Sequence, residues 1–326
     1  MKAFHEGFKA FKLVPSEESG ETVLQTERRK VRVTVGKSIK AHSAPLKICS
    51  EGVLDPVGVH YCPDSPADCY CYYPTDSILT RVRVDEGADA LLNEATDGFP
   101  PRSAKACASS LTVLEVLEGE VTSKDGLTTL IFKKGVLHNT EGPAWVQRDK
   151  SGAVLEEIFV EQGCISRPPE EGPCKILRHE NGWLKQVVYG AMDSLHRPTK
   201  DGPALVCWNE RGVMTKKAFY EGGVLNRPAE KGPAFNLWSD AGVKLQEIYC
   251  QKFIKHRPPE LGPACTFWDE KGEMDCMSFY KNGVMHRLRE DGPAWTSFEK
   301  DEKGTRWKKV LYFEEGRIVE PVHPGK

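Results

Sequence analysis

The dipeptide Gly-Pro recurs every 30 residues from residue 142 onward, and this period constrains the fold more than any other feature of the chain. It occurs six times, at Gly142-Pro143, Gly172-Pro173, Gly202-Pro203, Gly232-Pro233, Gly262-Pro263 and Gly292-Pro293. In the first five repeats a second glycine follows the proline by nine residues. Each repeat of such an array is one supersecondary unit that stacks on its neighbours. The sequence therefore predicts six stacked units of one kind.

The residues between these glycines and prolines favour β-strands. Residues 204–208 and 244–249 are typical, with β-branched, aromatic and aliphatic side chains bounded by Gly or Pro. A proline and two glycines in every repeat leave no uninterrupted window of helical length. We therefore predict a mainly β fold, an elongated antiparallel β-hairpin repeat array with one hairpin per repeat. Strand spacing predicts a rise of about 10 Å per repeat.

Aromatic residues keep the phase of the repeat. In-register hairpins would stack them into two ladders on the sheet. We interpret both ladders as core and not as ligand-binding platforms. One ladder lies five residues after the prolines and the other sixteen after them: Trp208, Trp238 and Trp268, and Phe159, Tyr189, Phe219, Tyr249 and Phe279.

An arginine recurs in the link that leads into each later Gly-Pro. The residues are Arg167, Arg197, Arg227, Arg257 and Arg287. Two hypotheses remain open for this ladder. The guanidinium groups could grip a repeating acidic partner, or each could pin its own link by bonding carbonyls or a carboxylate, a task that suits a fixed fork of donors. We favour the second interpretation.

The region before the repeats has a different character and is predicted to be a separate domain. We expect a small α+β head domain at 1–118, a degenerate capping hairpin at 119–134 and six hairpin repeats at 135–326. Alternation predicts strands at 77–84 and 31–35, whereas 104–117 is ambiguous between helix and strand.

The charge and the cysteine content limit which partners and which cellular compartment are expected. The 326 residues include 45 Lys plus Arg and 47 Asp plus Glu, for a net charge of -2, so the basic excess typical of nucleic-acid binding is missing. The start of the sequence has no secretory pattern, and no apolar run reaches the ~18 residues of a spanning helix. With eleven cysteines at irregular spacings, we expect reduced thiols in a cytoplasmic or virion setting, not a secreted protein. Protein partners are the expected ones.

The repeat itself resembles a known type. Gly-x-Leu-His-Arg followed by Gly-Pro-Ala, a glycine turn and an aromatic strand is similar to the variant MORN-like repeats of large DNA viruses, over about residues 127 to 318. Residues 58–62, 66–69 and 72–74 resemble an uncharacterised phage and viral domain with a Gly-Phe-His-Ala-Cys motif, from which Val59 and Tyr61 depart. The resemblance implies a structural or protein-binding role, such as that of a minor capsid protein or a similar virion component. Its expected partners are then other virion proteins.

The head contains the residues with most chemical potential. Five soft ligands, Cys49, His60, Cys62, Cys69 and Cys71, would suffice for a zinc site, but no Cys-x-x-Cys knuckle is present and free thiols are the preferred reading. A Cys62 nucleophile with His60 as base rests on chain proximity alone. The alternative function is an ADP-ribosyltransferase-like head targeted by the array, because His60 followed by Tyr72 and Tyr73 resembles that fold, although no catalytic Glu can be assigned. We predict a non-enzymatic protein with no cofactor and no catalytic residues.

Overall fold

The computed structural model describes residues 6–15, 22–25, 32–40, 59–63, 65–67, 77–93, 105–300 and 306–320. The chain forms two compact units, Met1–Cys164 and Ile165–Lys326, and each is described by itself. Strand is the dominant conformation in both, as predicted. The first unit contains the head and the first repeat, and the second contains the later repeats.

Two antiparallel sheets make up the described part of the head. The larger has the strand order β3-β2-β1-β6-β9-β4 and the smaller has the order β5-β8-β7. In the described part of the head, helical conformation covers only Pro66 and Ala67. The strands are β1 (Glu6–Pro15), β2 (Thr22–Gln25), β3 (Arg32–Val33), β4 (Ser38–Lys40), β5 (Val59–Tyr61), β6 (Ile78–Val84), β7 (Ala90–Asn93), β8 (Lys105–Ala108) and β9 (Ser110–Val116).

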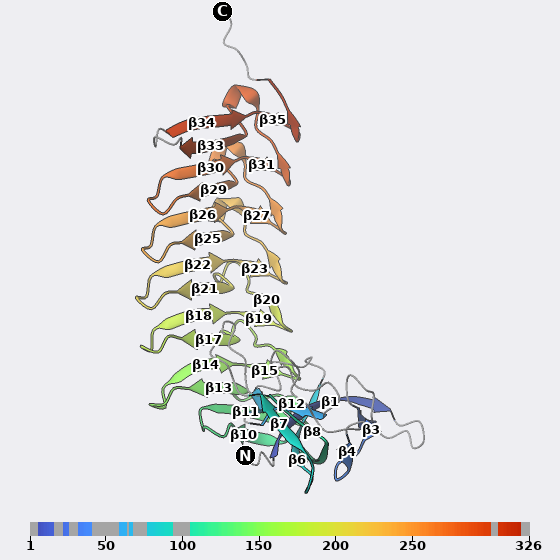
Figure 1. Cartoon of the computed structure of the whole chain (residues 1–326). Coiled ribbons are helices and arrows are strands. Elements are labelled where there is room, and N and C mark those ends of the chain that lie inside the picture. The colour runs from blue at the N-terminus through green and yellow to red at the C-terminus, as the bar shows by residue number, and fades with distance from the viewer. Residues whose placement is uncertain are drawn as a thin grey trace, which may run out of the picture. The chain divides into compact units, whose positions relative to one another are not determined.

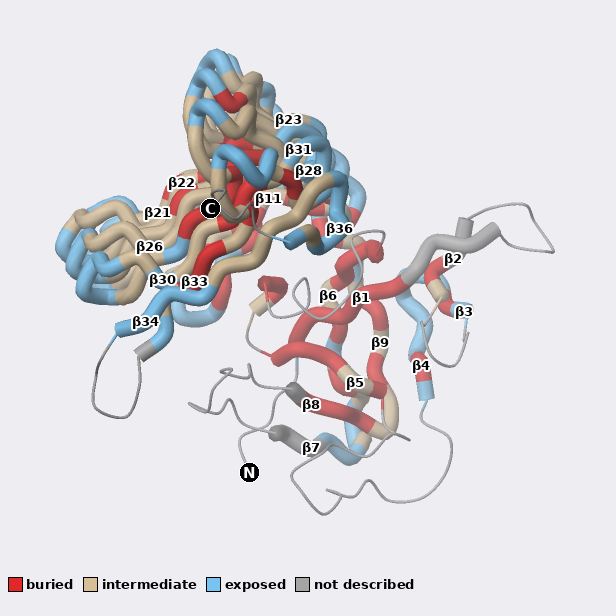
Figure 2. The backbone as a smooth tube through the Cα atoms, turned by 90° about the horizontal axis from the view of Figure 1, so that it is seen from above, coloured by how far each residue is buried: buried red, intermediate tan, exposed pale blue. Residues whose placement is uncertain are grey.

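The strand predicted at 77–84 is present as β6, and the ambiguous stretch 104–117 forms the two strands β8 and β9. The strands of both head sheets contribute buried side chains to one apolar core. It includes Phe11 of β1, Tyr61 of β5, Val82 of β6 and Leu111 of β9. Gly7 is required where β1 passes Tyr61, because a Cβ there would lie 2.5 Å from the ring and 2.6 Å from the Cys62 carbonyl oxygen. Figure 2 shows how buried positions gather in these strands.

The first compact unit continues into hairpins of the repeat type. Its strands are β10 (Gly119–Thr122), β11 (Thr128–Lys133), β12 (Val136–Leu137), β13 (Trp145–Arg148), β14 (Val154–Ile158), β15 (Val160–Glu161) and β16 (Cys164–Ile165). β10 and β11 pair as an antiparallel hairpin within the segment expected to cap the array. Gly135 joins this region to the head, since its carbonyl accepts from the Leu79 amide at 2.8 Å and its own amide donates to Leu117 at 2.7 Å.

The second compact unit is a succession of hairpins that follow one another in chain order (Figure 1). Every neighbouring pair with a described register is antiparallel. This arrangement confirms the predicted hairpin array. The main strands are β17 (Lys175–Arg178), β18 (Leu184–Val188), β21 (Leu205–Trp208), β22 (Met214–Ala218), β25 (Phe235–Trp238), β26 (Lys244–Ile248), β29 (Cys265–Trp268), β30 (Met274–Ser278), β33 (Trp295–Lys300) and β34 (Arg306–Leu311).

A polar side chain holds each main-hairpin turn that the structure describes. Asn209 Oδ1 accepts from the amides of Arg211 and Val213, each at 3.0 Å. Just before this residue a β-bulge lies at Cys207/Trp208 and shifts the register. The glycine that follows, Gly212, has a φ of 76°, which explains why the turn glycine recurs.

Each later repeat also contains a second, smaller hairpin that the one-hairpin interpretation missed. Its two-residue turn has both central residues at positive φ, as at Asn282 (50°) and Gly283 (83°), which is the type I′ geometry. Asn-Gly and Gly-Gly were available signals, but strands of two residues leave no period to detect. The small strands are β19 (Gly190–Ala191), β20 (Ser194–Leu195), β23 (Tyr220–Glu221), β24 (Val224–Leu225), β27 (Cys250–Gln251), β28 (Ile254–Lys255), β31 (Tyr280–Lys281), β32 (Val284–Met285), β35 (Phe313–Glu314) and β36 (Arg317–Ile318).

A narrow core runs through the array between the main strands and the small hairpins. Short 3-10 turns, η1 (Ala229–Lys231), η2 (Pro259–Leu261) and η3 (Arg289–Asp291), lead into Gly-Pro. The alanine after Gly-Pro is 0% exposed at positions 204, 234, 264 and 294. In the view along the array, buried segments lie in its middle and exposed segments at its outer edges (Figure 2). In the second repeat the position after Gly-Pro holds Cys174, which is 1% exposed, so the core accommodates only small side chains there.

Candidate functional site

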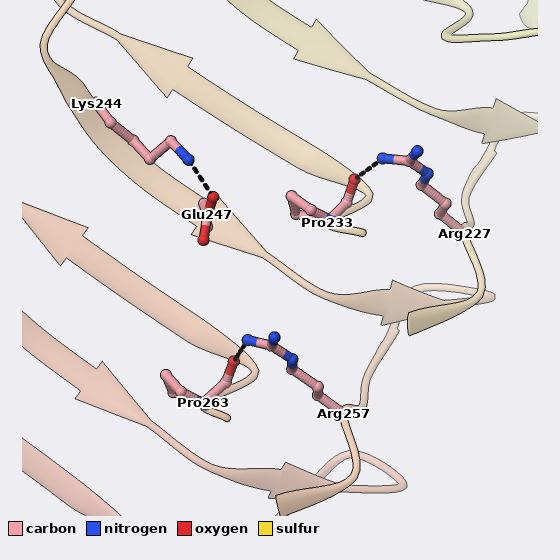
Figure 3. A network of polar contacts seen from close by, with 6 residues as sticks. All are labelled: Arg227, Pro233, Lys244, Glu247, Arg257 and Pro263. Atoms are coloured by element: carbon pink, nitrogen blue, oxygen red, sulfur yellow. Dashed lines mark hydrogen bonds and ion pairs between the residues drawn. The ribbon is translucent and has the colours of Figure 1, made fainter. Parts of the chain in front are cut away.

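The recurring arginine of each link points back into its own repeat. Arg227 Nη1 donates to the carbonyl oxygen of Pro233 at 3.0 Å, and Arg257 makes the same bond to Pro263 at 3.1 Å (Figure 3). The equivalent bonds from Arg167, Arg197 and Arg287 measure 3.3, 3.2 and 3.3 Å. The guanidinium thus bridges the two ends of the link.

Four of these guanidinium groups also lie over an aromatic ring of the second ladder. The distances from Arg Cζ to the ring centroid are 3.8 Å for Arg197 on Tyr189, 3.9 Å for Arg227 on Phe219, 3.9 Å for Arg257 on Tyr249 and 4.1 Å for Arg287 on Phe279. Rings and guanidinium groups therefore pack face to face, which is a favourable cation–π geometry. We call this set the Arg–aromatic column.

The Gly-Pro glycine completes the packing of the column. A Cβ on Gly232 would lie 3.1 Å from Arg227 Nη1, and Gly232 has a φ of 105°, where side chains are strained. Burial lowers the pKa of Arg227, and the nearby Tyr249 acts against that shift. The recurring Gly, Arg and aromatic residue thus serve one local structure. The Trp ladder is separate, since Trp208, Trp238 and Trp268 are half-buried at the bulges.

The histidine before the arginine ties one repeat to the next. His196 Nδ1 accepts from the Gly222 amide at 2.9 Å, and His256 Nδ1 accepts from the Asn282 amide at 3.2 Å. His138 and His286 make equivalent bonds. In one repeat Asn226 takes this place, and its Oδ1 accepts from the Lys252 amide at 3.2 Å. The residue before the arginine therefore has to accept a hydrogen bond from a backbone amide of the next small hairpin. A neutral imidazole or a side-chain amide can do so.

Substitution of His256 tests this requirement. We expect His256→Ala to lower the free energy of unfolding by about 1 kcal/mol, because the Asn282 amide loses its acceptor. The matched change His256→Asn should keep most of that stability, since Asn226 already performs the task. Urea denaturation and hydrogen exchange at the Asn282 amide measure both effects. Equal losses in the two variants would contradict the assignment.

The described cysteines of the array are thiols in apolar surroundings. Burial raises the pKa of Cys174 to about 11 and that of Cys250 to about 11. Burial also raises the pKa of Cys207, Cys265 and Cys276. Neutral thiols are poor nucleophiles, so these side chains pack as small apolar groups.

The raised values predict how the thiols respond to pH. At pH 8 we expect iodoacetamide to alkylate Cys174 and Cys250 at least about ten times more slowly in the folded protein than in urea, where an ordinary thiol has a pKa near 8.5. Stability should be complete below pH ~8.5 and fall as the pH rises toward 11, because only the unfolded chain loses these protons. Peptide mapping by mass spectrometry and melts across that range measure both, and equal labelling rates would contradict the prediction.

The head candidates for metal binding are only partly in view. His60 lies on β5 opposite Cys107 on β8, and Cys62 is buried where it bridges to Phe8. Cys49, Cys69, Cys71, Tyr72 and Tyr73 lie outside the described residues. Among the residues that are described, no group of three His, Cys, Asp or Glu side chains gathers as metal ligands. The described residues do not test the zinc hypothesis or the ADP-ribosyltransferase hypothesis, and both remain hypotheses.

The small hairpins carry several of the most exposed apolar side chains of the array, and Trp183 beside a main-hairpin turn is exposed as well, at 57%. We call residues 190–195, 220–225, 250–255 and 280–285 the hairpin ridge. Met192 is 81% exposed, Phe253 60%, Ile254 48% and Val284 41%. The ridge is the candidate binding surface. Sequence reasoning missed it, because nothing in a single repeat shows that these turns align along one edge.

Comparison with known proteins does not assign this chain to a family. Neither models of protein families nor curated protein sequences match this chain. Among the described residues, no helix is long and apolar enough to cross a membrane.

Proposed function

We propose that this chain is a non-enzymatic scaffold or protein-binding protein whose hairpin array carries the binding surface. One observation carries the proposal. The side chains that recur in the repeat, such as Arg227, Phe219 and His256, bond or pack within the array, while the exposed apolar side chains of the ridge differ from repeat to repeat. Exposed apolar groups that gather on one surface of a soluble fold are typical of interaction sites.

Partner capture by the full chain tests the proposal. Proteins captured from native lysate should be lost with the double variant Phe253→Asp/Val284→Asp. They should be retained with Trp307→Asp, which changes a residue of similar exposure, 45%, on β34. Partners that are retained by the ridge variant and lost after changes in the head would contradict this placement. NAD+ hydrolysis that depends on His60 would favour the enzymatic alternative instead.

The setting of the protein is also proposed. The resemblance of the repeats to those of large DNA viruses leads us to propose a cytoplasmic or virion-associated role, for example as a minor capsid component. Mass spectrometry of purified particles would detect the chain at a constant ratio to the major capsid protein. Its loss from particles on washing, with recovery only in the cytosol, would contradict the virion assignment.

A further inference from the structure

The hairpin ridge changes the sign of its charge along the array. Its first and second hairpins, 190–195 and 220–225, carry Asp193 and Glu221 as their only charged side chains. Its third and fourth, 250–255 and 280–285, carry only cations, Lys252, Lys255 and Lys281. All three lysines are exposed. The ridge therefore has an acidic half and a basic half of equal length.

Phe253 is strained in a way that local structure does not require. It occupies the second position of its type I′ turn with a φ of 66°, where other small hairpins have Gly163, Gly223 and Gly283. A bulky side chain at positive φ is an outlier, and strain of this kind clusters at functional sites. Here it projects a largely exposed ring from the basic half of the ridge.

The exposed aliphatic side chains of the basic half pack against the next hairpin and do not stand alone. Ile254 Cγ2 lies 3.1 Å from the Cβ position of Gly283, next to Val284, and Val284 Cγ1 lies 2.9 Å from that of Gly316. Consecutive hairpins therefore meet through Ile254 and Val284. In the acidic half, Gly222 faces open space, with nothing within 4 Å of its Cβ position, and Met192 is exposed beside Asp193.

We propose that the ridge binds the ridge of a second copy of this chain, antiparallel, about a two-fold axis. This inference specifies one partner for the scaffold function proposed above and rests on it. The two-fold places 250–255 against 220–225 of the second copy and 280–285 against 190–195. Because each repeat advances the array by the same rise, about 10 Å, both pairs come into register together.

The pairing is complementary in charge and in shape. Lys252 and Lys255 meet Glu221 of the second copy, and Lys281 meets Asp193. The Phe253 ring lies on the open turn at Gly222. A parallel pairing would instead place like charges opposite each other, and their repulsion disfavours that register. Four hairpins give a narrow strip about 40 Å long. Its contact area is smaller than that of a standard interface, about 800 Å² per partner, so the dimer should be reversible and sensitive to salt.

A charge swap tests the pairing with the full chain. Variant A is Lys281→Glu, and variant B is Met192→Lys/Asp193→Asn. Variant B keeps the acceptor that bonds the Ile165 amide. Each variant alone should raise the dimer dissociation constant about ten-fold or more in sedimentation velocity. An equimolar mixture should restore association, because both halves of an A–B pair are again complementary.

A second variant keeps the inference testable if either charge variant folds poorly. Phe253→Gly should raise the melting temperature, since the turn loses its strain, and weaken self-association at the same time. Wild-type chain that stays monomeric at low salt and high concentration would overturn the inference, and so would variants A and B that associate as the wild type does. A monomer that binds acidic peptides or phosphatidylserine vesicles through the ridge would assign it to those partners. Capture of other proteins by such a monomer would leave the scaffold function standing.

Discussion

Arg227→Ala should lower the free energy of unfolding by about 2–4 kcal/mol. The substitution removes a charge-assisted hydrogen bond to the Pro233 carbonyl and the packing of the guanidinium on Phe219. It also leaves a void beside Gly232. Urea denaturation followed by circular dichroism measures the loss.

Arg227→Lys is the matched control, because it keeps the positive charge. It should recover less than half of the stability, since an ammonium cannot stack on the ring and reach the carbonyl together. Partner binding measured where both variants are folded should change little. Intact stability with lost binding would contradict the architectural interpretation and would support an arginine ladder that grips an acidic partner.

Gly232→Ala should destabilise the array by a similar amount, about 2–4 kcal/mol. Gly232 has a φ of 105° and a ψ of -175°, a region that is essentially restricted to glycine and costs other residues about 1–3 kcal/mol. The added methyl group would also lie 3.1 Å from Arg227 Nη1 and would displace the guanidinium from its ring. Thermal and urea unfolding of the full chain measure the effect.

Gly222→Ala is the control that separates the backbone strain of Gly232→Ala from its clash with the Arg227 guanidinium. Gly222 has a φ of 57° in the ordinary left-handed region, and its Cβ position faces open space, so this change should cost only about 1 kcal/mol. The double variant Arg227→Ala/Gly232→Ala should lose less than the sum of the single losses, because the clash disappears with the guanidinium. Strict additivity would show that the two residues do not share one packing site.

The period, the strand class and the positions of the main hairpins follow from sequence alone. Gly-Pro and the turn glycine recur because local backbone geometry demands them, as the positive φ of Gly232 and Gly212 shows. Alternation in 77–84 was sufficient to predict β6. Features of this kind depend on residues within one strand or turn, and a sequence records them directly.

The direction of the arginine side chains, the histidine ties and the ridge required the tertiary structure. The sequence left Arg227 with two opposite interpretations, and the position of the Pro233 carbonyl relative to the Phe219 ring gives it partners inside its own repeat. The bond from Asn282 to His256 spans 26 residues and arises only when successive repeats stack. The ridge is a property of the stack as well, because its small hairpins are too short to leave a period and align only once the main strands have paired. Local chemistry determines the repeat, whereas contacts between repeats determine which surfaces remain free to bind.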